Sequence, residues 1–176
     1  MRIIAGKHRG RVLKEFKGRE IRPTADRAKE AIFNILQTDI YGSSFLDLFC
    51  GTGNMGVEAL SRGAEKVVMV DSSSASVAIA KFNVDMIKEN AEVILADAFT
   101  FVSTTREKFD IIFLDPPYDI DGAPILTAIA EYKLLKEGGV VIYERSEDFK
   151  VGEVKGLTLK NIRKYGVAHF EFYVEK

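Results

Sequence analysis

The sequence of 176 residues is poor in residues that cross-link chains or bind metals. It contains one cysteine, Cys50, and two histidines, His8 and His169, and it has no tryptophan. A single cysteine cannot close an internal disulfide bond, and no cysteine or histidine cluster has the spacing of zinc ligands. The composition therefore predicts neither a disulfide framework nor a metal site. It also gives little support to covalent catalysis by Cys50, which has no histidine pair near it.

Long apolar runs are missing as well. No stretch approaches the ~18 residues that a membrane-spanning helix requires, and the start does not have the pattern of a signal peptide. Hydrophobic residues make up 47% of the chain and charged residues 29%, as in ordinary globular domains. We therefore expect a cytoplasmic protein with no membrane partner, long enough to bury one proper core.

Charge is distributed unevenly along the chain. Residues 1–29 hold ten Lys or Arg and three Asp or Glu, a balance of +7, so the net charge of −1 leaves −8 for the rest. A basic segment on an acidic body is typical of phosphate contact, although a solvated arm that serves only solubility remains an alternative. Apolar and polar residues alternate on both sides of the turn from Gly6 to Gly10, which predicts a β-hairpin. We assign residues 1–22 to this basic hairpin extension and residues 23–176 to a single compact domain.

Apolar periodicity predicts the architecture of that domain. A helix begins near Thr24 and runs to about Gln37, and five strand-like runs then alternate with helices. The predicted strands are residues 45–49, 67–70, 93–96, 111–114 and 140–143, and the predicted helices are residues 55–62, 75–88, 99–104 and 123–135. Strands that alternate with helices indicate a parallel sheet covered on both faces. Residues 158–164 and 169–174 alternate about Tyr165-Gly166 and predict an antiparallel C-terminal hairpin.

A glycine-rich turn follows the first predicted strand. Gly51, Gly53 and Gly56 have the spacing of a dinucleotide-binding turn, and Asp71 lies about 20 residues beyond, where an acid bonds ribose hydroxyls. This pattern alone leaves a nicotinamide-dependent dehydrogenase, or a merely structural turn, as alternatives. Asp47 at the end of the strand favours S-adenosylmethionine, because a carboxylate attracts its cationic methionine part but repels a pyrophosphate. Asp97 could accept from an adenine amino group, or could simply cap the next helix.

The tetrapeptide Asp115-Pro116-Pro117-Tyr118 follows the apolar run 111–114. An exocyclic amino group is a poor nucleophile until acceptors bind its protons and localise its lone pair. Asp115 supplies such an acceptor, Pro116 has no N–H with which to continue a strand, and Tyr118 could stack on the base. A pocket of this kind orients a methyl acceptor and stabilises the charge that develops on its nitrogen. A strand-ending turn is the plainer interpretation.

Several motifs resemble those of known methyltransferases. Residues 47–53 resemble motif I of class I S-adenosylmethionine methyltransferases, and residues 115–118 resemble motif IV of the members that methylate amino groups. Over essentially the whole chain the sequence is similar to the RsmD family, on three motifs: Arg2-Ile-Ile-Ala-Gly with Gly10-Arg11, Arg22-Pro-Thr-x-Asp-Arg-x-Lys-Glu-Ala-x-Phe-Asn34, and Glu58-Ala-Leu-Ser-Arg-Gly-Ala64. Cys50 stands where a small alanine is common in motif I, and we interpret it as packing beside the cofactor.

The resemblance implies a Rossmann-like class I methyltransferase with a mostly parallel seven-stranded sheet. It implies methylation of the N2 amino group of a guanine in 16S ribosomal RNA, of the guanine-966 type, with S-adenosylmethionine and without a metal. The residues implied to bind the cofactor are Asp47, Cys50, Gly51, Gly53, Asp71, Asp97 and Ala98, and the catalytic ones are Asp115, Pro116 and Tyr118. An adenine-N6 methyltransferase, or a nucleic-acid-binding protein with a vestigial cofactor fold, remains an alternative.

The expected partner is small-subunit ribosomal RNA, within an assembling or assembled small subunit. The candidates for RNA contact are Arg9, Arg11, Arg22, Thr24 and Arg27. For Arg22, Thr24 and Arg27 a role in capping and surface charge at the start of the helix is an equal alternative. Glu144 and Arg145 follow the fifth predicted strand, and we interpret them as an ion pair at the edge of the sheet rather than as site residues.

Overall fold

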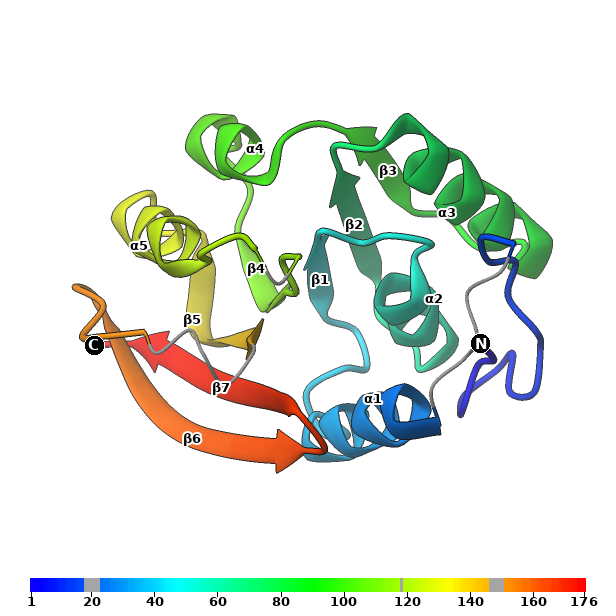
Figure 1. Ribbon diagram of the computed structural model, residues 1–176, viewed down its shortest axis with the longest axis horizontal. Helices are drawn as coiled ribbons and strands as arrows, with labels where there is room; N and C mark the ends of the chain where they lie inside the picture. Colours follow the sequence, from blue (N-terminus) through cyan, green and yellow to red (C-terminus); the bar gives the residue numbers. More distant parts are fainter. Residues whose placement is uncertain (18–22, 118, 146–150) are drawn as a thin grey trace.

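The computed structural model describes residues 1–17, 23–117, 119–145 and 151–176. Within these residues one sheet has seven strands in the order β3-β2-β1-β4-β5-β7-β6 (Figure 1). The strands are β1 Ser44–Leu48, β2 Lys66–Asp71, β3 Glu92–Leu95, β4 Phe109–Leu114, β5 Leu135–Arg145, β6 Leu157–Tyr165 and β7 Ala168–Glu175. The predicted sheet, mostly parallel with an antiparallel C-terminal hairpin, is confirmed.

The strand order reverses at β1. From β1 the chain builds outward through β2 to β3, and it then returns to place β4 on the other side of β1. All three of these pairings, and that of β4 with β5, are parallel. In open α/β sheets a ligand binds outside the carboxyl ends of the strands at such a reversal, because the loops there diverge to opposite faces.

Helices cover both faces of the sheet, and strand residues alternate between the two cores. Helices α1 (Pro23–Ile35), α2 (Asn54–Ser61) and α3 (Ser74–Ile87) share one core with Phe45 and Phe113. Helices α4 (Ala98–Thr104) and α5 (Ala123–Glu131) share the other with Leu46 and Leu114. Figure 1 shows α4 and α5 on one side of β1 and β4, and α1 and α2 on the other. The face to which a side chain at the end of a strand points therefore follows from the core in which its strand neighbours lie.

One helix end differs from the prediction. The apolar periodicity predicted a helix over residues 123–135, whereas α5 ends at Glu131. Lys133 adopts a left-handed conformation with φ 55°, and Leu135 is already the first residue of β5. Leu134 and Leu135 are both buried. They continue the apolar pattern of the helix while belonging to the turn and the next strand, so periodicity alone could not mark the boundary.

The N-terminal segment forms a hairpin-like loop with a single bridge, between Arg2 and Val12, in place of two full strands. The Gly10 N–H donates to the Ile3 carbonyl over 2.8 Å, which closes the predicted turn. Ile3 and Leu13 are buried in the same core as α1. This segment therefore packs against the body of the domain, and the domain boundary at residue 22 stays a prediction.

Candidate active site

The glycine turn lies between β1 and α2, at the carboxyl edge of the sheet. Gly51 and Gly53 have φ of 54° and 81°, values that glycine adopts without strain. A Cβ added at Gly53 would lie 3.1 Å from the Met69 sulfur, so this glycine packs on the core. A Cβ added at Gly51 would meet no atom within 4 Å. The outer side of the turn at Gly51 is thus open for a ligand to approach the backbone.

Two aspartates hold this turn in place. The Gly51 N–H donates to Asp71 Oδ2 over 2.8 Å, and Asp71 Oδ1 accepts from the Ser73 N–H, also over 2.8 Å. The Gly56 N–H donates to Asp47 Oδ2 over 2.9 Å. Asp71 joins the end of β2 to the turn, and Asp47 joins the end of β1 to the first turn of α2.

Asp47 is a buried carboxyl with an unusual electrostatic environment. Its side chain is 2% exposed, and burial, together with the neighbouring Asp115 and Asp71, raises its pKa to about 8. A buried carboxylate is costly unless a cation or several donors compensate it. Among the described residues the Gly56 N–H is the one hydrogen-bond donor to Asp47, so a cationic ligand group at this edge would stabilise the charged form of Asp47. The predicted role of Asp47 in holding the cofactor stays a prediction.

Asp97 caps α4. Its Oδ1 accepts from the Thr100 N–H over 2.9 Å and from Thr100 Oγ1 over 3.0 Å, so the capping interpretation is observed directly. Ala98, the first residue of the helix, is buried. The Asp97 Oδ2 atom has no hydrogen-bond partner in the described part of the chain. An additional contact of Asp97 and Ala98 with an adenine stays a prediction.

Cys50 lies in the turn and is buried, with 7% of its surface exposed. Its Sγ is 3.8 Å from the Gly51 carbonyl oxygen. Burial, with the nearby Asp47 and Asp71, raises the pKa of the thiol above its usual range. Because a thiolate is needed for nucleophilic attack, this environment disfavours Cys50 as a nucleophile and agrees with a packing role.

Asp115 directly follows β4, and its N–H makes a long contact of 3.4 Å with the Leu48 carbonyl at the end of β1. This contact keeps Asp115 beside the glycine turn. Burial raises the pKa of the partly exposed Asp115 to about 7. Pro116 is buried and Pro117 is exposed. Tyr118, the predicted stacking residue, lies outside the described residues.

The interpretation of Glu144 and Arg145 as an edge ion pair is wrong. Arg145 Nε lies 2.6 Å from Glu171 Oε1, and Glu171 also accepts from the Tyr173 hydroxyl. The register of β4 with β5 places Glu144 beside Asp115, and burial together with Asp115 raises the pKa of Glu144 to about 8. Successive residues of a strand point to opposite faces, and this alternation was the signal that could have separated the two side chains.

The candidate RNA-contacting residues are only partly described. Arg9 and Arg11 are exposed in the N-terminal loop, and Arg11 Nη1 donates to the Met86 carbonyl on α3 over 2.8 Å. Arg27 is exposed on α1. Arg22 and the side chain of Thr24 lie outside the described part of the structure. Of these candidates, the described and exposed arginines lie on the loop and on α1, and their contact with RNA stays a prediction.

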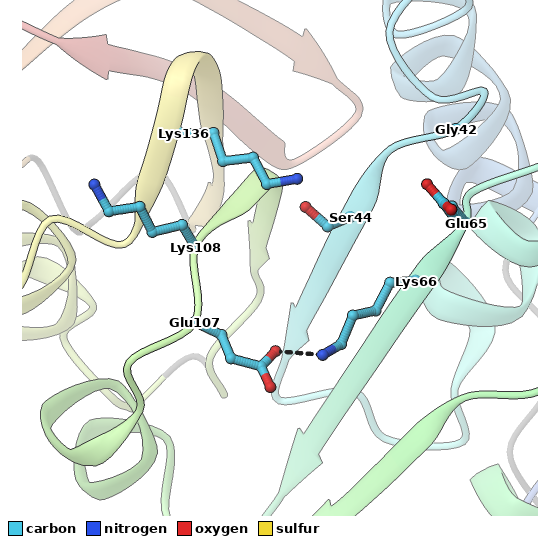
Figure 2. Close-up of a pocket in the computed structure, with 7 residues that line it drawn as sticks. All are labelled: Gly42, Ser44, Glu65, Lys66, Glu107, Lys108 and Lys136. Atoms are coloured by element: carbon cyan, nitrogen blue, oxygen red, sulfur yellow. Dashed lines mark ion pairs between the residues drawn. The ribbon is translucent and has the colours of Figure 1, made fainter.

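A hollow of about 510 Å³ lies at the opposite, amino edge of the sheet (Figure 2). Two of its lysines form ion pairs: Lys66 Nζ is 2.7 Å from Glu107 Oε2, and Lys136 Nζ is 2.8 Å from Asp110 Oδ2. None of the predicted site residues lines it. Among the described residues no group of three or more potential metal ligands gathers, and no helix is long and apolar enough to cross a membrane.

The strand order, the glycine turn after β1 and the acidic strand ends define a class I methyltransferase. A solved structure from Escherichia coli, described as the candidate methyltransferase yhhF, superimposes with a TM-score of 0.90 at 28% identity, covering 100% of this chain and 98% of that chain. A solved structure from Thermus, described as the hypothetical protein TTHA0928, superimposes with a TM-score of 0.85 at 29% identity, covering 100% of this chain and 99% of that chain.

The chain belongs to the family described as "Conserved hypothetical protein 95", which matches residues 1–174. It is 34% identical over 179 residues to the Haemophilus influenzae protein named "Ribosomal RNA small subunit methyltransferase D", covering 98% of this chain and 93% of that protein. A Bacillus subtilis protein, YlbH, described as a candidate rRNA methyltransferase, is 35% identical over 183 residues and 100% of both chains. The resemblance to the RsmD family is confirmed, and the nicotinamide-dependent alternative is set aside.

Proposed function

We propose that this enzyme transfers a methyl group from S-adenosylmethionine to the N2 amino group of a guanine in small-subunit ribosomal RNA. The observation that carries the proposal is the position of Asp115, a half-buried acceptor held beside the glycine turn by its contact with Leu48. The relative of this chain in Haemophilus influenzae is named as a methyltransferase of small-subunit ribosomal RNA. The guanine-966 type of target remains a prediction within this proposal.

The residues at the carboxyl edge fit S-adenosylmethionine. The open side of Gly51 admits a ligand to the backbone, and the buried Asp47 needs a cationic partner. Asp71 and Asp97 would hold the ribose and the adenine, with Cys50, Gly53 and Ala98 packing around them. When bound, the cofactor would supply an electrophilic methyl group: the bond from carbon to the acceptor nitrogen forms as the C–S bond breaks, and the C–S electron pair stays on sulfur.

Asp115 activates the acceptor. Its carboxylate accepts from the protons of the N2 amino group and so keeps the nitrogen lone pair out of the purine ring. The Pro116 carbonyl and the Tyr118 ring complete this grip in the proposal. As the N–C bond forms, the nitrogen becomes positive, and the carboxylate stabilises that charge before the surplus proton passes to Asp115 or to water. The protein thus contributes alignment and electrostatics, and the electrophile comes from the cofactor.

The basic N-terminal loop would bring the RNA to this edge. Its exposed Arg9 and Arg11 offer charge to phosphates without reading sequence. The N2 group of a paired guanine lies in the minor groove of its helix, so we expect the target to be unpaired or splayed from its stack. Whether naked RNA or an assembling or assembled small subunit is the natural substrate is decided by comparing both in the same assay.

The test is transfer of labelled methyl to small-subunit RNA and to small subunits from cells that lack the gene. Asp115→Ala is expected to lower transfer by roughly 100-fold or more. The control Glu65→Ala, an exposed acid in the hollow at the opposite edge, keeps wild-type activity. Digestion of the product identifies the nucleoside. N2-methylguanosine supports the proposal, whereas N6-methyladenosine, or full activity of Asp115→Ala, contradicts it.

A further inference from the structure

We propose that Glu144 selects guanine over adenine, by accepting the N1–H of the base whose amino group Asp115 holds. This inference rests on the proposed function and adds to it the origin of base specificity. In the proposed function Asp115 accepts from any planar amino group, which leaves guanine and adenine undistinguished. A second acceptor beside Asp115 is what the choice of guanine requires.

The strand register brings the two carboxyls together. In the parallel pair of β4 and β5, Leu114 is the partner of Tyr143. The residues that follow them are Asp115, directly after the end of β4, and Glu144, still within β5. Adjacent strands lie about 4.8 Å apart, and residues at the same register point to the same face. Phe113 and Ile142 lie in the core under α1–α3, and Asp115 and Glu144, two residues further along, share that face.

Aromatic side chains form an apolar layer beside the pair. Phe170 on β7 is the register partner of Glu144, and its ring stacks on Phe113 with centroids 6.5 Å apart. Tyr165 packs edge-on against Phe170 at 5.8 Å. Burial raises the pKa of both carboxyls, and the neighbouring Asp115 adds to the shift of Glu144. The rings place a flat apolar surface next to the acceptors.

Neither carboxyl has a hydrogen-bond partner among the described residues. The cation nearest in sequence, Arg145, is turned to the other face, where it pairs with Glu171. Half-buried acceptors without donors are costly, and they are common where a ligand supplies the donors. The pair therefore presents two neighbouring acceptors to a ligand at the carboxyl edge.

The Watson–Crick edge of guanine matches this pair. It carries two neighbouring donors, N1–H and N2–H, whereas adenine has one donor, N6–H, beside the lone pair of N1. With guanine, Asp115 accepts from N2–H and Glu144 from N1–H. With adenine, an ionised Glu144 would face the N1 lone pair and stay unsatisfied, whereas a protonated Glu144 could donate to it. Because burial and Asp115 raise the pKa of Glu144 to about 8, the preference for guanine is expected to be full only above that pH. Adenine would lose a hydrogen bond to a charged group and meet repulsion in its place. This loss corresponds to roughly a 10- to 100-fold preference for guanine.

The test uses RNA in which the mapped target guanine is replaced by 2-aminopurine. This base keeps the 2-amino group, and it has a lone pair at N1 in place of N1–H. At about pH 8.5, where a Glu144 with a pKa of about 8 is mostly ionised, the wild-type kcat/KM for guanine is expected to exceed that for 2-aminopurine by roughly 10-fold or more. In Glu144→Gln the amide can donate to N1, so the ratio falls at least roughly 10-fold. The control Glu131→Gln, at an exposed acid of α5, keeps the wild-type ratio.

The ratio of the two kcat/KM values is measured on one variant, so a smaller amount of folded enzyme lowers both values equally and leaves the ratio unchanged. A variant without activity is tested through binding, because 2-aminopurine fluoresces, and competition with guanine RNA then gives the relative affinity. In Glu144→Leu the two RNAs are expected to compete equally. If wild-type enzyme does not methylate guanine at all, the proposed function fails. If it does, and Glu144→Gln leaves the ratio unchanged, the role of Glu144 is overturned while the function stands.

Discussion

Asn83 and Lys14 are joined by two hydrogen bonds, although they lie 69 positions apart in the sequence. The Lys14 N–H donates to Asn83 Oδ1 over 2.8 Å, and Asn83 Nδ2 donates to the Lys14 carbonyl over 3.0 Å. The same amide nitrogen donates to the Thr52 carbonyl over 2.9 Å. Asn83 on α3 therefore holds the basic N-terminal segment and the glycine turn with one fully buried side chain.

Replacing Asn83 tests this link. Asn83→Ala leaves an N–H and two carbonyls without their partner at a site with 0% exposure, so we expect a loss of unfolding free energy on the order of 3 kcal/mol. Binding of S-adenosylhomocysteine and of RNA should both weaken, because both the turn and the segment lose a fixed position. Urea unfolding and titration calorimetry measure these effects. Asn34→Ala, on the exposed face of α1, is the matched control and should change stability by less than about 0.5 kcal/mol.

Two glycines of the N-terminal loop separate backbone strain from close packing. Gly6 and Gly10 have φ of 83° and 85°, but a Cβ added at Gly6 would lie 1.8 Å from the Ser61 carbonyl oxygen, and one at Gly10 would meet nothing within 4 Å. Gly10→Ala should cost about 1–2 kcal/mol for the left-handed conformation alone. Gly6→Ala adds the displacement of the loop from α2, so it should cost more and should weaken RNA binding. Equal losses of unfolding free energy in the two variants would contradict the packed loop.

Part of this arrangement follows from sequence and part does not. Glycine spacing and strand periodicity predicted the turn at Gly51 and the carboxylates at the strand ends, because both are local properties of the chain. The docking of Gly6 on Ser61 depends on the distance between segments that no local pattern records. Glu144 was predictable in part. The face to which its side chain points follows from strand alternation, whereas its proximity to Asp115 follows only from the register of β4 with β5.

The stability of the ligand-free enzyme should fall as pH rises from about 4 to about 8. Burial raises the pKa of Asp47 to about 8 from an ordinary 3.8, so in this window the folded state binds more protons than the unfolded state. The unfolding free energy then decreases with pH, because each proton must be lost at a cost from the folded state. Urea unfolding at pH 5 and pH 8 should differ by at least about 1 kcal/mol.

Asp47→Asn removes one source of this dependence. The variant should be less sensitive to pH than the wild type across the same window, whereas Asp39→Asn, at an exposed position, should follow the wild type. Addition of S-adenosylmethionine should also reduce the dependence, because its cation favours the charged carboxylate and lowers the pKa of Asp47. A wild-type stability that rises between pH 5 and pH 8 would contradict the raised pKa.

Charge reversal in the N-terminal loop tests whether it contacts phosphates. The double variant Arg9→Glu and Arg11→Glu should weaken RNA binding and lower the slope of log K against log salt by roughly 0.7 to 0.9 for each lost contact, because fewer counterions are released. Filter binding at several salt concentrations measures the slope. Arg106→Glu with Lys108→Glu makes the same charge change at exposed residues before β4. If both pairs change the slope equally, the loop acts only through net charge, as a solvated arm would; a change confined to the loop variant indicates direct contact.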